Sequence, residues 1–325
     1  MANKKLKIGV LFGGKSAEHE VSLASAKNII RALDRKKYEI VSVKIPKNGK
    51  FEIEKLKKFD VVFPVMHGPY GEDGSIQGLL KILDVPFVGA SVLGSAVGMD
   101  KDIMKRLLRE AGIPIGKFLV YRAIDEIKYS EISKKLGFPV YVKPANMGSS
   151  IGIAKIKNEK ELKKAVLSAF QYDLKIIIEE EIKGREIECS VLGNDEPIAS
   201  LPGEIVPDED FYSYKAKYVT NKTKLVIPAI LPNTTIEKVQ TTAVKIFQTL
   251  NCEGMGRVDM FLTKSGKIYV NEINTIPGFT DISMYPKLWE ASGISQSELL
   301  DTLIVLAIER FEKESKLGTP KKVAI

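Results

Sequence analysis

The sequence predicts an α/β protein built from two or three compact units, and three observations support that expectation. The chain has 325 residues, which is more than one domain usually contains. Segments of strand and helix character alternate from its start to Gly89, as is typical of a parallel sheet covered by helices. Its composition, 44% hydrophobic and 28% charged residues, is that of an ordinary globular protein. We expect units at 1–98, 99–183 and 184–325.

The first unit is expected to alternate strands and helices along the chain. Its predicted strands are 7–12, 39–45, 59–66 and 86–89, and its predicted helices are 22–33 and 74–83. Pro64 cannot donate a hydrogen bond to a strand ladder. We therefore expect a bulge or a strand end at Pro64.

The second unit is predicted to be a small α+β structure, and the third to be mixed. Asp100 is a suitable N-cap for a helix that ends at Ala111, before Gly112 and Pro114. The other elements expected in the second unit are strands 117–121, 139–143, 151–156 and 174–181 and helix 159–170. The third unit is expected to contain strands, a polar and aromatic loop at 207–224, helix 235–250, a hairpin and a closing helix 296–311.

Composition and charge argue against several classes of protein. No apolar run is long enough to span a membrane, and the apolar stretch after the basic start is too short for a signal peptide. The two cysteines, Cys189 and Cys252, are too few for a disulfide framework. The net charge of +8 arises from lysines spread over the chain. We expect a cytoplasmic protein without nucleic-acid or membrane partners, and a basic nucleic-acid-binding protein remains the alternative of a different class.

The segment 256–274 predicts a pair of carboxylates on one face of a hairpin. If Ser265 and Gly266 form a two-residue turn, Asp259 lies opposite Glu272, and Arg257 lies opposite Asn274. Opposed carboxylates repel unless a cation lies between them, and Mg²⁺ prefers such oxygen ligands. The alternative is that both acids face solvent on an edge hairpin whose register is shifted by a bulge.

Two loops have the composition of ligand-binding segments. Lys143 precedes a glycine- and serine-rich stretch that reaches Gly152, and such a loop can hold phosphate, although it also fits an ordinary tight turn and is no Walker A motif. The stretch 13–22 follows the first strand, where open α/β sheets bind ligands, but its glycine spacing does not fit a dinucleotide site. His67 follows another predicted strand. Its position fits a ligand-binding residue, and it fits a hydrogen-bonded loop histidine equally well.

Taken in order, eight segments resemble the motifs of the D-alanine–D-alanine ligases of the ATP-grasp superfamily. They are 17–23, 67–74, 99–101, 142–144, 148–150, 214–218, 256–259 and 271–278. The resemblance implies a flavodoxin-like N-terminal domain followed by a two-domain ATP-grasp fold. It also implies ATP-dependent joining of two D-alanine molecules for peptidoglycan precursor synthesis. D-alanyl-D-lactate and D-alanyl-D-serine ligases are the close alternatives, and the family is commonly homodimeric.

The resemblance assigns a nucleotide and metal site. It implies that Lys101, Lys143 and Lys217 face ATP phosphates, with Ser149 and Ser150 in a phosphate loop. Backbone groups of Glu180 and Ile182 would meet adenine, and Glu186 would bind the ribose. Two Mg²⁺ ions, for which Mn²⁺ could substitute, would be held by Asp259, Glu272 and Asn274.

The resemblance also assigns the D-alanine subsites. Glu18 would receive the ammonium of the first D-alanine, with His67 nearby. Arg257 and the N–H of Gly278 would stabilise the oxyanion formed when the second amine attacks. Ser283 and the backbone of Met284 would take the second carboxylate. Tyr218, on a mobile loop at about 205–225, would close the site through Ser149 and Glu18.

Overall fold

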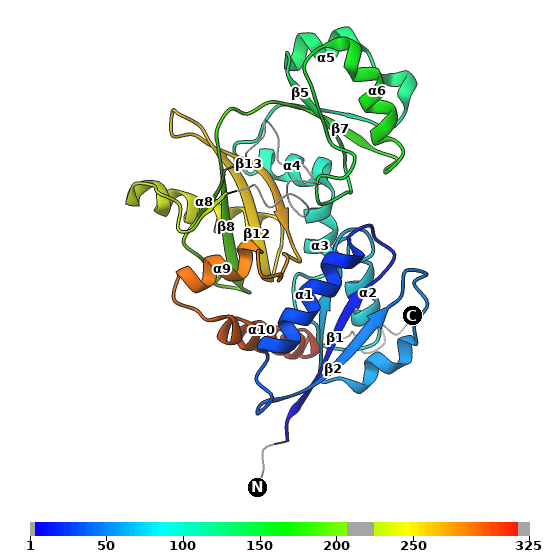
Figure 1. Ribbon diagram of the computed structural model, residues 1–325, viewed down its shortest axis with the longest axis vertical. Helices are drawn as coiled ribbons and strands as arrows, with labels where there is room; N and C mark the ends of the chain where they lie inside the picture. The colour runs from blue at the N-terminus through cyan, green and yellow to red at the C-terminus, as the bar shows by residue number, and fades with distance from the viewer. Residues whose placement is uncertain (1–3, 207–223, 318–325) are drawn as a thin grey trace, which may run out of the picture.

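The computed structural model describes residues 4–206 and 224–317, which are arranged around three sheets (Figure 1). The first sheet has the order β2-β1-β3 and is parallel throughout, as predicted. Its strands are β1 (Leu6–Gly13), β2 (Tyr38–Ile45) and β3 (Val61–Val65). The strand expected at 86–89 is reduced to a single parallel bridge between Val62 and Phe87.

The interruption expected at Pro64 is absent, because β3 continues in register beside β1 to Val65. The N–H of Val62 donates to the carbonyl of Pro86 at 2.8 Å, on the side of β3 away from β1. Residues two apart in a strand direct their N–H groups to the same side. The position where Pro64 lacks an N–H therefore faces away from β1, on the side where β3 pairs only through the bridge at Val62. The ladder between β3 and β1 is unaffected.

Helices cover both faces of the first sheet. They are α1 (His19–Ala32), the 3₁₀ helix η1 (Ile53–Lys58), α2 (Ser75–Ile82) and, from the end of the chain, α10 (Gln296–Ser315). α1 begins three residues before the predicted start, because Glu18 already occupies its N-cap position. A further helix, α3 (Val92–Met99), was not predicted, since its two glycines weaken the helical pattern.

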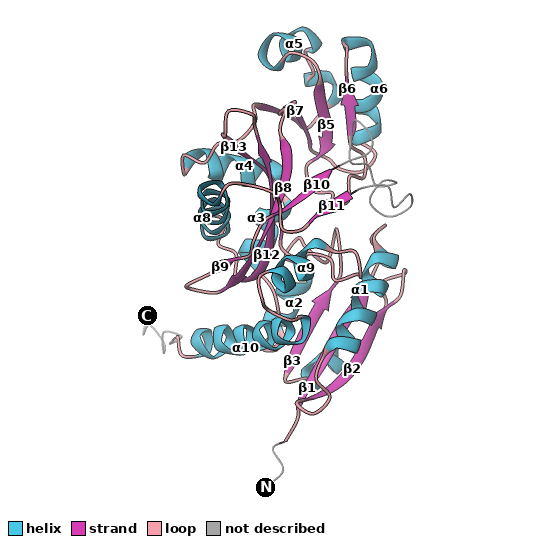
Figure 2. Cartoon of the chain, turned by 60° about the vertical axis from the view of Figure 1, so that its left-hand side comes forward, coloured by secondary structure: helices cyan, strands magenta, loops and turns pink. Residues whose placement is uncertain are grey.

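The last helix completes the core of the first sheet. Leu299, Leu303 and Ile304 of α10 belong to the same buried cluster as Ile8 and Val10 of β1. Arg310, also from α10, donates to the carbonyls of Phe87 and Gly89, at 2.8 and 2.5 Å. Segments that are 200 residues and more apart in the sequence therefore share one core (Figure 2).

The second sheet has the order β4-β7-β5-β6 and is antiparallel. Its elements are β4 (Phe118–Tyr121), η2 (Ile124–Glu126), α5 (Tyr129–Leu136), β5 (Val140–Pro144), β6 (Ala154–Ile156), α6 (Glu159–Ala169) and β7 (Ile176–Glu180). α4 (Lys101–Glu110) precedes them, and Asp100 caps it through the N–H groups of Asp102 and Ile103, as expected.

The third sheet has the order β11-β10-β8-β12-β13, and β9 also pairs with β8. Its strands are β8 (Arg185–Gly193), β9 (Ile198–Ala199), β10 (Gly203–Val206), β11 (Lys224–Val226), β12 (Gly254–Leu262) and β13 (Ile268–Asn274). α8 (Asn233–Thr249) packs on it, and α9 (Met284–Ala291) follows it. The loop expected at 207–224 lies outside the described residues, apart from Lys224.

The boundaries 1–98, 99–183 and 184–325 stay a proposal, since the hydrophobic cores cross them. Met104 and Leu108 of α4 pack in the cluster of the third sheet, and α10 packs on the first. Within the described parts of the chain, no single helix is long and apolar enough to cross a membrane. Among the described residues, one pair of helices, α9 and α10, has the length and apolar composition of a membrane span when taken together, but the two are bent by 107° relative to each other.

Candidate active site

The hairpin of β12 and β13 has the predicted register at its functional end. Asp259 pairs with Glu272, and Arg257 pairs with Asn274. The predicted two-residue turn is wrong, because Thr263 N–H donates to Lys267 O at 3.0 Å, which leaves three residues in the loop. Gly266, the last of them, has φ 75°, a left-handed conformation that favours glycine.

A β-bulge explains why the register was nevertheless correct. Below the turn Met260 pairs with Val270, and the register then shifts by one residue between Met260 and Asp259. The extra residue is Asn271, so the bulge offsets the longer loop. Bulges re-aim side chains near active sites, and here both Asn271 and Glu272 line the same cavity.

Three carboxylates lie abreast on the third sheet. Asp259 pairs with Glu272 on β13 and with Glu188 on β8. Arg257 offsets this charge: its Nε and Nη2 each donate to Asp259 at 2.8 Å, and its Nε lies 2.8 Å from Glu188. Burial would lower the pKa of Arg257, but Asp259 and Glu188 outweigh it and raise that pKa. Sequence reasoning missed Glu188, although alternation along β8 places it on the same face as Glu186.

The oxygen donors in this region fit a hard divalent cation. Asp259 and Glu272 supply carboxylates, and Asn274 lies close enough to donate its Nδ2 to Asp259 at 3.0 Å. Among the described residues, no three acidic, histidine or cysteine side chains converge on one point. The two carboxylates and the amide oxygen of Asn274 therefore fit Mg²⁺ if a bound ligand supplies further oxygens, since Mg²⁺ commonly binds one or two carboxylates and phosphate oxygens.

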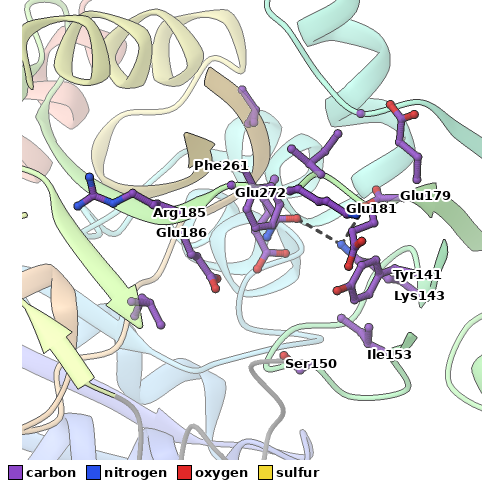
Figure 3. A pocket seen from close by; sticks show the side chains of 18 of the residues that line it. Tyr141, Lys143, Ser150, Ile153, Glu179, Glu181, Arg185, Glu186, Phe261 and Glu272 are labelled. Carbon is purple, nitrogen blue, oxygen red and sulfur yellow. Dashed lines mark hydrogen bonds and ion pairs between the residues drawn. The ribbon is translucent and has the colours of Figure 1, made fainter. Parts of the chain in front are cut away.

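The larger cavity in this region has a volume of about 330 Å³ and lies between the second and third sheets (Figure 3). That is enough for a small-molecule ligand. Six residues predicted for the nucleotide site line it: Lys143, Ser150, Glu180, Ile182, Glu186 and Glu272. The sequence reasoning missed other residues of the lining, among them Lys105, Tyr141, Glu179 and Asn271.

Buried ion pairs organise the charged wall of this cavity. Lys143 Nζ lies 2.9 Å from Glu179 Oε2 and 3.2 Å from Asn271 Oδ1, while Lys105 Nζ lies 3.1 Å from Glu179 Oε1. Burial would raise the pKa of Glu179, but Lys105 and Lys143 outweigh it and lower that pKa to about 2. Glu179 is therefore a carboxylate at neutral pH.

Lys101 connects the phosphate-loop segment to the carboxylate row. Its Nζ donates to the carbonyl of Met147 at 2.8 Å and lies 3.3 Å from Glu272. The side chain is nearly buried, with 6% exposure. One ammonium group thus holds the loop that begins at Gly148 close to the strand that carries Glu272.

A second, smaller cavity of about 100 Å³ adjoins the first, and Glu272 lines both. It brings together predicted residues from distant parts of the chain: Glu18, His67, Ser149, Arg257, Asn274, Gly278, Ser283 and Met284. Tyr218 and Lys217, the other residues predicted for the site, lie outside the described residues.

Glu18 stands at the N-terminal end of α1 and closes one side of the smaller cavity. Its Oε1 accepts a hydrogen bond from Ser149 Oγ. Gly68 lies so close that a Cβ there would be 2.6 Å from Glu18 Oε2, and its φ is 73°. Glycine is therefore required at this position, next to a buried carboxylate.

His67 lies in the wall of the smaller cavity with both ring nitrogens engaged. Nδ1 lies 3.1 Å from the carbonyl of Ile276, so it carries the proton, and Nε2 accepts from Ser25 Oγ at 3.2 Å. Ser25 Oγ in turn accepts from Phe279 N–H at 3.1 Å. Burial lowers the pKa of His67 to about 4. A neutral imidazole therefore fixes the segment that contains Gly278.

Ser283 and Met284 both line this cavity, at the start of α9. Ser283 Oγ accepts from Thr280 N–H at 2.9 Å. A Cβ on Gly278 would lie 2.7 Å from that oxygen. The backbone around Gly278 thus passes directly beside Ser283.

Sequence comparisons with known proteins agree with one another. The family described as D-ala D-ala ligase C-terminus matches residues 107–305, and the family described as D-ala D-ala ligase N-terminus matches residues 7–57 and 47–90. A D-alanine–D-alanine ligase of Oceanobacillus iheyensis is 47% identical over 98% of this chain and 99% of the relative. A D-alanine–D-alanine ligase of Halothermothrix orenii is 50% identical over 94% of this chain and 99% of the relative.

Solved structures give the same picture. The D-alanine–D-alanine ligase of Coxiella burnetii has a TM-score of 0.86 at 40% identity and covers 96% of each chain. VanG D-Ala:D-Ser ligase of Enterococcus faecalis has a TM-score of 0.85 at 37% sequence identity, and the match covers 94% of this chain and 100% of that one. A D-alanine–D-alanine ligase of Bacillus anthracis complexed with ATP has a TM-score of 0.82 at 34% sequence identity, and the match covers 95% of this chain and 99% of that one.

Proposed function

The chain belongs to the D-alanine–D-alanine ligase family, and from this premise we propose that the larger cavity binds ATP and the smaller one the two amino acids. The protein is an ATP-grasp enzyme that joins two D-alanine molecules into D-alanyl-D-alanine for peptidoglycan synthesis. We assign the two cavities in this way because they share a wall at Glu272. A phosphoryl group in the larger cavity and a carboxylate in the smaller one would meet there.

In the first step, the carboxylate of the first D-alanine attacks the γ-phosphate of ATP, which gives an acyl phosphate and ADP. Glu18 is suited to hold the ammonium of this D-alanine, because its carboxylate lines the smaller cavity. Lys143 and Lys101 are suited to offset charge on the transferring phosphoryl group. Such electrostatic stabilisation and positioning account for most of the catalysis of phosphoryl transfer.

In the second step, the amine of the second D-alanine attacks the acyl carbon and phosphate leaves. Arg257 and the N–H of Gly278 lie in one wall of the smaller cavity and are suited to stabilise the oxyanion. His67 acts here through the backbone that it fixes. Ser283 and Met284 are suited to receive the carboxylate of the second D-alanine.

Magnesium belongs to the proposal as well. Asp259, Glu272 and Asn274 would hold two Mg²⁺ ions, or Mn²⁺ in their place, and the metal would neutralise phosphate charge when bound. Tyr218 and Lys217 keep their proposed roles in closing the site and contacting phosphate, on the strength of the resemblance alone. A homodimer and a cytoplasmic location are proposed on the same ground.

The experiment measures ADP release by the purified protein with ATP and Mg²⁺, and the mass of the product. Its arms contain no amino acid, D-alanine, L-alanine, D-alanine with D-lactate, or D-alanine with D-serine. We expect release and a dipeptide mass with D-alanine and not with L-alanine. Preferential formation of a mixed D-alanyl-D-serine product would favour the second candidate, a D-Ala:D-Ser ligase, as the structurally similar VanG protein is named. ADP release that does not depend on D-alanine would contradict the proposal.

A further inference from the structure

Lys105 is a buried lysine of the larger cavity to which neither the motifs nor the proposed steps give a role. It lies one helical turn after Lys101 on α4, so both side chains leave the same side of the helix. It lines the cavity and is only 2% exposed. Burying an ammonium group is costly unless a charge partner compensates it, and the partner here is Glu179, at 3.1 Å.

Glu179 divides its two oxygens between two lysines. Oε1 faces Lys105 at 3.1 Å, and Oε2 faces Lys143 at 2.9 Å. Lys143 is the lysine proposed to face the phosphates of ATP. A pair of Lys143 and Glu179 alone would have no net charge, whereas the trio with Lys105 carries one positive charge.

That single charge lies where a polyanion has to bind. Glu272, which also lines the cavity, is compensated by Lys101 at 3.3 Å. Interactions between charges are stronger in a buried site than in water. A neutral trio would therefore attract the triphosphate less than a positive one.

We propose that Lys105 is a positioning residue for ATP: by taking one oxygen of Glu179, it leaves the charge of Lys143 available to the phosphates. This inference rests on the proposed binding of ATP in the larger cavity. Lys105 itself need not touch the nucleotide. Its effect passes through Glu179 to Lys143.

The test compares ATP binding by four proteins: the unchanged chain, Lys105→Met, Lys105→Met with Glu179→Gln, and Lys175→Met. Lys175 is the matched control, since it is also a buried lysine in an ion pair, with Asp100, but does not line the cavity. Titration calorimetry with ATP and Mg²⁺, without D-alanine, gives Kd. Steady-state assays give KM for D-alanine.

We expect Lys105→Met to weaken ATP binding about tenfold, while KM for D-alanine and the Kd of Lys175→Met change less than twofold. Adding Glu179→Gln restores one net positive charge, so the double variant should bind ATP more tightly than Lys105→Met alone. A merely structural role predicts further loss in the double variant. If the ATP Kd of Lys105→Met stays within twofold of that of the unchanged chain, the inference is overturned but the proposed function is not. The same holds if the double variant binds ATP no more tightly than Lys105→Met. Absence of ATP binding by the unchanged chain would overturn the proposed function too.

Discussion

Glu272 lines both cavities and lies 3.3 Å from Lys101. The substitution Glu272→Gln keeps the shape of the side chain and removes the charge needed for a metal ligand. We predict at least a hundredfold loss of D-alanine-dependent ADP release, because phosphoryl transfer depends on charge neutralisation at this point. Glu237→Gln, on the exposed side of α8, is the control. Near-normal turnover of Glu272→Gln would remove the metal assignment.

His67 makes stability depend on pH. Its pKa is about 4 in the folded protein and about 6.5 when unfolded, so the unfolded state binds more protons between these values. The free energy of unfolding should therefore fall as the pH falls through this window. From pH 7 to 5, we predict that the protein loses about 2 kcal/mol more than His67→Asn. Urea unfolding at both pH values measures this difference, and equal losses would contradict the neutral, buried imidazole.

Individual residues differ in how far the sequence predicted them. Asp259 and Glu272 were found because strand alternation is a local rule, and the register at that end was correct. Lys105 and Glu179 were missed because each looks like an ordinary charged residue of a solvated face. Their burial depends on how α4 meets the second sheet, which no local pattern contains.

At the scale of single elements, the first turn of α4 joins a helix cap to an ion pair. Asp100 accepts from two backbone N–H groups and also from Lys175 Nζ, at 2.6 Å. Asp100→Asn keeps a cap acceptor and removes the charge, whereas Asp100→Ala removes both. We predict that both variants lose stability, and that alanine loses about 1 kcal/mol more than asparagine. Thermal or urea unfolding measures the two losses, and equal values would show that the cap contributes nothing.

Elements were predicted more reliably than their details. The helix from Asp100, the parallel strands and the α10 segment all appear, because caps and hydrophobic periodicity mark them. The hairpin shows why details fail: a three-residue loop replaced the predicted turn, and the bulge at Asn271 compensated for it. The sequence contains no local signal for a bulge of this kind. α3 was missed because packing, and not propensity, stabilises it.

At the scale of the whole molecule, α10 closes the core of the first sheet. We predict that residues 1–98 alone do not fold cooperatively, because the buried cluster of β1 and β3 would lose the side chains that α10 contributes to it. Circular dichroism and urea unfolding of this fragment provide the measurement. Adding residues 284–317 through a flexible linker should restore a cooperative transition. A sharp transition in the fragment alone would contradict the prediction.

The division into successive units was the limit of what chain order could predict. Order along the chain predicted successive units of strands and helices, but the return of α10 to the first sheet depends on a contact across more than 200 residues. Such contacts leave no periodic pattern in either partner. The resemblance supplied the fold family, and the packing of the ends came only from the structure.

The return of α10 also has a consequence during biosynthesis. About 230 residues separate the end of β3 from the start of α10, and a ribosome adds roughly 5–20 residues per second. For about 10–50 seconds, the nascent first sheet therefore has α1 on the face that α10 later covers but lacks α10, so part of its apolar surface is exposed to the cell. Chaperones that bind exposed apolar strands would have that interval in which to act, and newly made protein should depend on them more than protein that is already complete.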